Sequence, residues 1–296
     1  MSPPENPPLP PAFVLVVGVL ATSLSATLIR FAQAEAPSLV IAAARLAIAT
    51  TLLLPWTAGW RQDELRRLPP AGWRLALLSG FMLALHFAAY IGSLEFTSIA
   101  AATVLATSTP IWVGLAAPIV LREALTGPLR LGIVLAIAGS LLIGLGDDSS
   151  ASRPLLGNSL ALASALTGAV YFLIGRRLRP HLSLLSYTTV VYGMSALTLL
   201  FLTWLGGYSF LGYSPTVYLL FLLMALFPQL LGHSSYNYAL AFLPAAYVSV
   251  AIISEPIGAS ALGLLVFGEV PALLTVAGSV LILTGVFIAG RRPTAR

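Results

Sequence analysis

Long, continuous runs of apolar residues constrain this chain more than any other feature of its sequence. A helix needs about 20 mostly apolar residues to cross the roughly 30 Å of hydrocarbon in a bilayer. Ten runs of about that length follow one another, joined by short connections that carry Pro or Gly. The runs cover residues 12–34, 38–55, 73–94, 98–121, 129–146, 156–178, 184–206, 216–240, 246–268 and 272–290. This pattern predicts an all-α integral membrane protein with ten transmembrane helices.

The composition excludes a water-soluble fold of this size. Charged residues make up 8 % of the chain, against about 25 % in soluble proteins, and 58 % of the residues are hydrophobic. All 15 basic residues are Arg, and they lie in short clusters between apolar runs rather than on one water-facing patch. We therefore predict the lipid bilayer as a partner, and no nucleic acid. The chain has no Cys, which excludes disulfides and thiolate chemistry.

The Arg residues also set the orientation of the chain. Cytoplasmic loops of membrane proteins carry an excess of Lys and Arg. With ten spans both termini lie on one side, and 12 of the 15 Arg residues fall on that side, which we therefore expect to be cytoplasmic. Residues 1–11 are Pro-rich and lack the basic segment of a secretory signal. They are predicted to form a disordered cytoplasmic leader, and residues 291–296 a cytoplasmic tail.

The second half of the chain repeats the first at a single offset of 146 residues. The offset aligns residue types that chance would not bring together in an apolar sequence. The aligned pairs include Arg30 and Arg176, Tyr90 and Tyr236, Pro110 and Pro256, and Glu123 and Glu269. Each repeat holds five predicted spans, in residues 12–146 and 156–290. Because five is odd, the second copy enters the membrane from the opposite face, and such inverted repeats are typical of secondary transporters.

Each half also ends with a Pro-containing span, an acidic residue and a Gly-rich last span. The segments are TPIWVGLAAPIVLREALT in the first half and EPIGASALGLLVFGEVPA in the second. They resemble the paired EamA-type repeat of the drug/metabolite transporter superfamily, and the whole chain resembles its YddG-like exporters of amino acids and metabolites. Arg122 departs from the family pattern, in which Gly usually precedes the acid. The resemblance implies ten helices as two inverted five-helix repeats around a central cavity, and export of small organic solutes across a bacterial inner membrane.

Glycines recur at seven-residue spacing in the last span of each half. They are Gly132 and Gly139 in the first half, and Gly278 and Gly285 in the second. Small residues on one helix face let two backbones approach closely. The spacing therefore predicts close packing between helices.

Polar side chains inside the spans mark the predicted substrate site, because each one is costly in hydrocarbon. The candidates are His86 and Tyr90 in the third span, and His233, Tyr236 and Asn237 in the eighth. Hydrogen bonding between helices would also explain such residues taken singly. Because Tyr90 and Tyr236 are repeat partners, we expect both clusters to face one central cavity.

The fourth and ninth spans carry Pro in mid-span, with hydroxyl groups beside it. Pro110 and Pro256 each deprive a carbonyl of its donor and are predicted to kink their helices. Freed carbonyls can accept from an ammonium group, while the hydroxyls of Thr107 and Thr109 can donate to a carboxylate. Both ends of an amino acid would be held in this way. A kink that serves only packing is the alternative.

Two ionisable residues lie far from the span ends. Glu255 is the only acid deep within a span, which makes it a candidate proton carrier or partner of an ammonium group. A purely structural Glu-Pro pair is the alternative. Arg45 is the only base in such a position, and it either anchors a carboxylate or pairs with backbone carbonyls. Trp112 and Tyr171 are candidates to line the cavity, although a single aromatic residue also suits the core or the interfacial belt.

The motifs of competing functions are missing from the sequence. No Walker A, HExxH or GxSxG pattern occurs, so we predict no enzyme activity, no metal and no cofactor. A sugar nucleotide would need several intramembrane bases, and only Arg45 is present. We therefore predict a secondary transporter that exports amino acids, including aromatic and hydrophobic ones, and related small metabolites by alternating access. A proton-coupled multidrug exporter is the alternative. The sequence leaves the energy coupling and the oligomeric state open, and a monomer is compatible with it.

Overall fold

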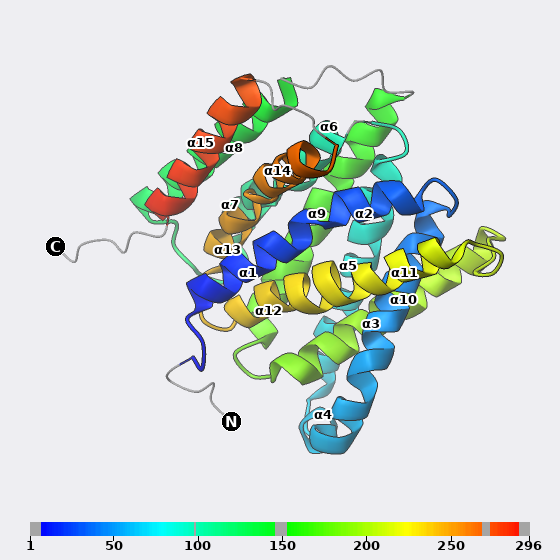
Figure 1. Ribbon diagram of the computed structural model, residues 1–296. Coiled ribbons are helices and arrows are strands. Elements are labelled where there is room, and N and C mark those ends of the chain that lie inside the picture. The colour runs from blue at the N-terminus through cyan, green and yellow to red at the C-terminus, as the bar shows by residue number, and fades with distance from the viewer. Residues whose placement is uncertain (1–6, 98, 146–152, 268–272, 290–296) are drawn as a thin grey trace.

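The computed structural model describes residues 7–97, 99–145, 153–267 and 273–289, which are almost entirely helical (Figure 1). The first half contains α1 (Pro11–Ser23), α2 (Ser25–Ala32), α3 (Ser38–Trp60), α4 (Gln62–Arg66), α5 (Pro70–Ser93), α6 (Ile99–Ala106), α7 (Thr109–Val120) and α8 (Gly127–Leu145). The second half contains α9 (Pro154–Leu178), α10 (Leu184–Leu205), α11 (Pro215–Met224), the π-helix η1 (Ala225–His233), α12 (Ser234–Ala239), α13 (Ala245–Ile252), α14 (Glu255–Phe267) and α15 (Leu273–Ala289). The described residues contain no strand, so the predicted all-α class is confirmed. Most of the predicted leader and the whole tail lie outside the described residues.

Within the described residues, seven helical segments are long and apolar enough to cross a membrane. They are Pro11–Ala32, Ser38–Trp60, Pro70–Ser93, Ala102–Val120, Leu155–Leu178, Leu184–Leu205 and Pro215–Ala239. Three shorter apolar helical segments, Gly127–Leu142, Ala245–Gly258 and Val276–Ala289, lie in the remaining predicted runs. The chain is therefore a multi-pass membrane protein. The number of ten spans stays a prediction, because it depends on these three shorter segments.

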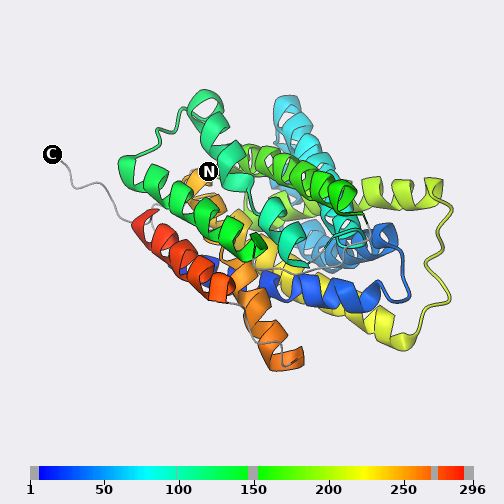
Figure 2. The same cartoon turned by 90° about the horizontal axis from the view of Figure 1, so that it is seen from above.

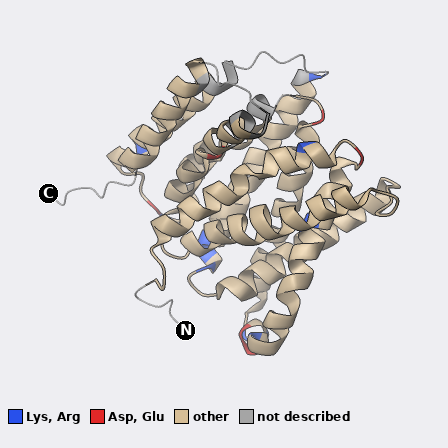
Figure 3. Cartoon of the chain, viewed as in Figure 1, with Lys and Arg blue, Asp and Glu red and all other residues tan. Residues whose placement is uncertain are grey.

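The outer surface of the helices is apolar. Phe13 and Leu20 of α1, and Phe201 and Trp204 of α10, are each more than half exposed. Soluble proteins rarely expose contiguous apolar surface on this scale. The charged residues lie mostly at helix ends and in connecting loops, while the helical ribbons are otherwise nearly free of charge (Figure 3). This distribution suits a protein whose sides face lipid and whose ends face water.

Several of the apolar spans are interrupted near their middle. α1 and α2 meet at Leu24, α6 and α7 at residues 107–108, and α13 and α14 at residues 253–254. Pro110 and Pro256 are the second residues of α7 and α14, where the N–H that Pro lacks has no partner within the helix. The eighth predicted span passes through η1, which has Pro228 inside it. Such π segments are frequent at functional sites.

Helices of the two halves pack against one another in pairs. α8 lies along α15 at one side of the molecule (Figures 1 and 2). α3 packs against α10, α5 against α9, and α1 against both η1 and α12. The core of the molecule therefore lies between the halves rather than within each one.

Glycine residues allow α8 and α15 to approach closely. A Cβ atom at Gly132 would lie 2.6 Å from the carbonyl oxygen of Gly285, and one at Gly285 would lie 2.7 Å from that of Gly132. Neither position has room for a larger residue unless a backbone moves. The seven-residue glycine spacing thus falls on an interface between helices, as the sequence predicts.

Candidate functional site

A partly enclosed cavity lies between the helices, and both halves of the chain contribute to its lining. All four interruptions described above border it, since Thr22, Thr107, Ile252 and His233 are among its lining residues. The cavity volume is about 50 Å³. A water molecule needs roughly 10–15 Å³ of such space, so the cavity has room for only a few waters. Sites for drug-sized ligands are about 300–1,000 Å³, so a metabolite requires the helices to move apart.

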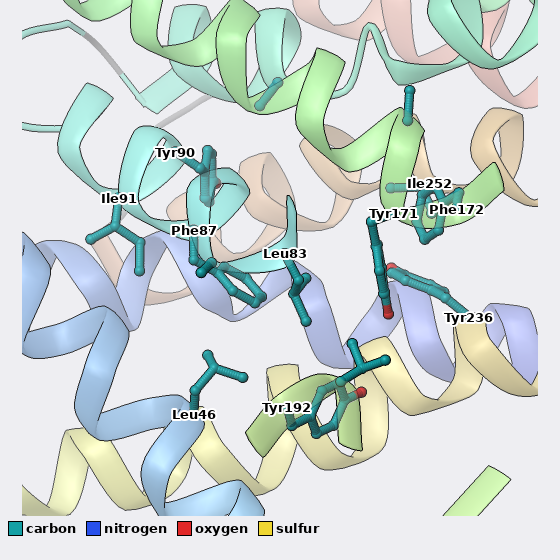
Figure 4. Close-up of a cluster of buried hydrophobic side chains, with 14 of the residues drawn as sticks. Leu46, Leu83, Phe87, Tyr90, Ile91, Tyr171, Phe172, Tyr192, Tyr236 and Ile252 are labelled. Atoms are coloured by element: carbon teal, nitrogen blue, oxygen red, sulfur yellow. The ribbon is translucent and has the colours of Figure 1, made fainter. Parts of the chain in front are cut away.

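Eight of the predicted site residues lie together in this lining. They are His86, Tyr90, Thr107, Thr109, Tyr171, His233, Tyr236 and Glu255. Figure 4 shows Tyr171, Phe172 and Tyr236 gathered at one side of the cluster and Phe87 at the other. Aromatic faces thus form much of the cavity wall, and its polar groups come from many helices of both halves. The role of these residues in binding stays a prediction.

Two predicted residues lie behind the wall. Asn237 is fully buried, accepts a hydrogen bond of 2.8 Å from the hydroxyl of Tyr171 and donates one of 3.3 Å to that of Tyr192. It therefore positions Tyr171 of the wall. Trp112 packs against the hydrophobic core from α7, and its indole nitrogen is buried without a hydrogen-bond partner. Pro110 and Pro256 lie at the helix breaks, outside the lining.

Glu255 is the first residue of α14 and lies on the cavity wall. Its carboxylate accepts a hydrogen bond of 2.8 Å from the hydroxyl of Tyr236, which lies 2.5 Å from the hydroxyl of Thr22. The backbone carbonyl of Glu255 accepts a further bond of 3.3 Å from the hydroxyl of Ser23. A negative charge in the first turn of a helix is favoured by the unpaired N–H groups there. These contacts join α1, α12 and α14 at the acid.

His86 and His233 lie edge to face, with their ring centroids 6.2 Å apart. The Nδ1 atom of His86 lies 2.9 Å from the backbone carbonyl oxygen of Ser164, so this nitrogen acts as a donor. The Nδ1 atom of His233 is buried and has no hydrogen-bond partner. One imidazole is thus fixed to α9, while the other keeps a free ring nitrogen.

Arg45 of α3 also lines the cavity. Its Nε atom donates to the side-chain oxygen of Gln229 at 2.9 Å, and its Nη1 atom donates to the hydroxyl of Ser25 at 3.0 Å. The guanidinium carbon lies 4.3 Å from the centre of the Phe87 ring, which is close enough for a cation–π interaction. Within the described residues it makes no hydrogen bond to a backbone carbonyl. The sequence leaves the role of Arg45 open, and the structure places it at the site.

Sequence reasoning misses several other lining residues, of which four are polar or aromatic. These four are Thr22, Ser25, Phe87 and Thr103. Single Ser, Thr and Phe residues are common in apolar spans, so composition gives no signal for them. The repeat gives a partial signal for Thr103, because the offset of 146 residues pairs it with Ser249, a buried polar residue in the second half.

Polar contacts join the halves toward the end of the spans that holds Arg176. This residue of α9 donates to the carboxylate of Glu123 at 2.5 Å and to the carbonyl of Leu240 at 3.0 Å. Glu123 also accepts from the backbone N–H of Ala245 at 3.3 Å. The Arg176–Glu123 contact is the single ion pair within the described residues. The repeat partner of Glu123 is Glu269, which lies outside them.

Glu64, in the connection between α3 and α5, joins the halves at the same end. Its carboxylate accepts hydrogen bonds from the N–H and hydroxyl of Ser183, at 2.5 and 2.6 Å, and from the hydroxyl of Ser186 at 2.5 Å. Burial opposes ionisation of this acid, but the three hydrogen bonds and the charge of Arg61 together outweigh burial and lower the pKa of Glu64 below its ordinary value. At the opposite end of the spans, Thr97 donates to Asn158 at 2.9 Å.

A multi-pass helical protein with a cavity that holds polar groups between two similar halves has the general design of a secondary transporter. The chain matches the EamA-like transporter family over residues 9–145 and again over residues 155–291. Because the two matches cover most of its length, the protein belongs to the EamA-like transporter family. The resemblance to paired EamA-type repeats is thus confirmed.

Individual relatives agree with this assignment. An uncharacterized transporter of Archaeoglobus fulgidus is 26 % identical over 281 residues, covering 94 % of this chain and 98 % of that protein. The uncharacterized transporter YwfM of Bacillus subtilis is 26 % identical over 286 residues, covering 95 % and 93 %. YetK of the same organism is 30 % identical over 100 residues, which span 33 % of this chain and 30 % of YetK. A protein of known crystal structure, 17 % identical, superposes with a TM-score of 0.76 over 95 % of this chain and 96 % of the other, which shows the fold alone.

Proposed function

We propose that this transporter exports amino acids, including aromatic and hydrophobic ones, and related small metabolites. The observation that carries the proposal is the combination of groups around the central cavity. Glu255 offers a carboxylate to an ammonium group, and Tyr171, Phe172 and Tyr236 offer ring faces to an apolar side chain. An amino acid with an apolar side chain presents both of these features. Multidrug export requires only the ring faces and the acid, so substrate competition has to separate the two functions.

The proposed architecture is ten spans arranged as two inverted five-helix repeats, in residues 12–146 and 156–290. Helix packing supports this arrangement. Helices related by the offset of 146 residues pack against each other, as α3 does with α10 and α8 with α15. The packing of α1 against η1 corresponds, after exchange of the halves, to the packing of α9 against α5. Such pseudo-symmetric contacts are typical of inverted-repeat transporters.

Alternating access follows from the same arrangement. The cavity of about 50 Å³ is too small for an amino acid, and polar contacts join the halves toward both ends of the spans. We infer an occluded conformation in which the contacts at one end or the other must break before a substrate enters. Two inverted halves provide two similar packings that open to opposite sides.

Purified protein in liposomes is expected to transport L-phenylalanine and L-leucine more efficiently than lipophilic cations or nucleotide sugars. Tyr90→Ala should lower amino-acid flux about tenfold or more, because it removes a buried side chain that lines the cavity. The matched control is Tyr208→Ala, which removes an exposed tyrosine of the loop after α10. Efficient transport of the cations without competition from amino acids would instead establish multidrug export. Equal flux in the two variants would leave Tyr90 with a packing role.

We also propose a bacterial inner membrane location with both termini in the cytoplasm. Because the chain has no Cys, single Cys residues can report this directly. Ser209→Cys, in the exposed loop between α10 and α11, should react with an impermeant thiol reagent in intact spheroplasts. Gln62→Cys, at the exposed start of α4, should react only after permeabilisation. The reverse labelling pattern would invert the assignment.

A further inference from the structure

Arg45 brings a positive charge to the cavity, and within the described residues no carboxylate is in direct contact with it. Its side chain is 1 % exposed. Within the described residues no acid lies within 4.0 Å of its guanidinium, since the single ion pair there joins Arg176 and Glu123. Its hydrogen-bond partners, Ser25 and Gln229, are neutral. A charge at membrane depth is costly, and unbalanced ones mark paths for ions or substrates.

Three buried nitrogen atoms, on Arg45, on its hydrogen-bond partner Gln229 and on His233, lack hydrogen-bond partners. They are Nη2 of Arg45, Nε2 of Gln229 and Nδ1 of His233. The guanidinium lies 4.3 Å from the centre of the Phe87 ring, and the centroid of that ring lies 5.0 Å from the His233 centroid. Buried polar atoms in proteins nearly always have a partner. Nη2 of Arg45 and Nε2 of Gln229 always carry N–H groups, so each lacks an acceptor. Nδ1 of His233 lacks an acceptor too in the tautomer that places the ring proton on it.

We propose that Arg45 binds the carboxylate of the transported compound, with Gln229 and His233 as further donors. This inference rests on the proposed function and narrows it, because it makes a free carboxylate a requirement for transport. A guanidinium presents its donors in a planar fork that matches the two oxygens of a carboxylate. Arg45 and Glu255 border the same cavity and carry opposite charges, which suits a zwitterion. Within the described lining Arg45 is the one Arg, so a phosphate dianion would lack its second positive charge.

Three compounds of one shape separate the groups that are recognised. L-Phenylalanine has both the ammonium and the carboxylate, L-phenylalaninamide lacks the carboxylate, and 3-phenylpropionate lacks the ammonium. Binding is measured as the shift of the thermal unfolding midpoint of the full chain in detergent, and transport as counterflow in liposomes. Phenylalanine and 3-phenylpropionate should both raise the midpoint, and the amide should not. Equal shifts with phenylalanine and its amide would overturn the proposal.

Arg45→Gln should raise the concentration of phenylalanine that gives a half-maximal shift by about ten- to a hundredfold, as expected for loss of a charged hydrogen-bond partner. Arg45→Lys should lose less, because the charge is kept while the fork is lost. Arg30→Gln, which removes an exposed Arg at the end of α2, is the matched control and should bind like the wild type.

Gln229→Glu tests the same site without removing Arg45. The new carboxylate would lie next to the Nε atom to which Gln229 already bonds at 2.9 Å. The introduced carboxylate should form an ion pair with Arg45 and so exclude the carboxylate of the substrate. The variant should keep the fold and lose the thermal shift with phenylalanine. A variant that folds and binds phenylalanine like the wild type would overturn the proposal.

The outcomes also separate this inference from the proposed function. Arg45-dependent stabilisation by 3-phenylpropionate without transport of any amino acid would contradict amino-acid export and retain the carboxylate site. Amino-acid transport that Arg45→Gln leaves unchanged would contradict the carboxylate site and retain amino-acid export.

Discussion

Replacing Glu255 by Gln is expected to lower amino-acid flux by about ten- to a hundredfold and to remove its response to an imposed pH gradient. Gln keeps the shape of the side chain, and its amide oxygen can still accept the hydrogen bond from Tyr236. The substitution therefore removes ionisation and little else. A carboxylate can bind either a proton or the ammonium group of a substrate, but not both at once. Such competition couples the movement of protons to the movement of substrate. The measurement is flux against pH in liposomes, for the wild type and for the variant.

Two further variants identify the role of the acid. Glu255→Ala removes the acceptor for Tyr236 as well, so it should lower the thermal midpoint more than Glu255→Gln does. Tyr236→Phe keeps the acid and removes its hydrogen-bond donor, so pH dependence should persist with altered affinity. If Glu255→Gln transports like the wild type at every pH, Glu255 has a structural role beside the break before α14, and export proceeds without this acid.

Much of the fold follows from the sequence because a bilayer removes alternatives. Backbone groups in hydrocarbon must pair within their own segment, so a long apolar run predicts a helix directly. The repeat then predicts which helices are equivalent, through matches such as Pro110 with Pro256 that an apolar composition does not produce by chance. Helix interruptions are less accessible to such reasoning. Leu24 separates α1 from α2 with no Pro or Gly beside it, so the local sequence gives no sign of that break.

The candidate site was predictable where polar side chains are rare. His86, His233 and Glu255 stand out in apolar runs, and all three line the cavity. Asn237 stands out equally but lies behind the wall. The sequence did not predict this, because residue type does not reveal which side of a helix faces the cavity. Periodicity is a weak guide in this region, since the π-helix η1 ends at His233, immediately before the helix α12 that carries Asn237, and rotates the following residues relative to an α-helix.

Arg45 shows a different limit. Its residue type and its depth in the span indicate a functional role, but the sequence allows two interpretations. The guanidinium either binds a carboxylate or pairs with backbone carbonyls. The contact that distinguishes them is made by Gln229, which is 184 residues away in the chain. Its side-chain oxygen accepts the hydrogen bond of Arg45 that a backbone carbonyl would otherwise accept. Only the packing of α3 against η1 brings the two side chains together. A pattern in a single sequence does not reveal such side-chain contacts between the two halves of a duplicated chain.

The glycine contacts between α8 and α15 lead to the largest expected effect on stability. A Cβ atom at Gly139 would meet the backbone carbonyl of Gly278 and the backbone and side chain of Ile282. Gly139→Leu should therefore force the two helices apart, with a loss of about 3 kcal/mol or more, at the upper end of the range for overpacked sites. The measurement is the thermal midpoint in detergent, together with the fraction of protein that elutes as a single species.

The matched control for this variant is Gly59→Leu, which adds the same side chain near the end of α3, where no atom of another helix lies within 4 Å of the new Cβ. It should unfold at the temperature of the wild type. The Gly139 variant should also lose flux, because α8 packs against α6 and α15 against α13, and these two helices end at breaks beside the cavity. A shift in the packing of α8 and α15 would thus reach the groups that hold the substrate. Equal stability of the two variants would mean that α8 and α15 do not approach this closely in the folded protein, and the pseudo-symmetric pairing of the last helix of each half would lose its support.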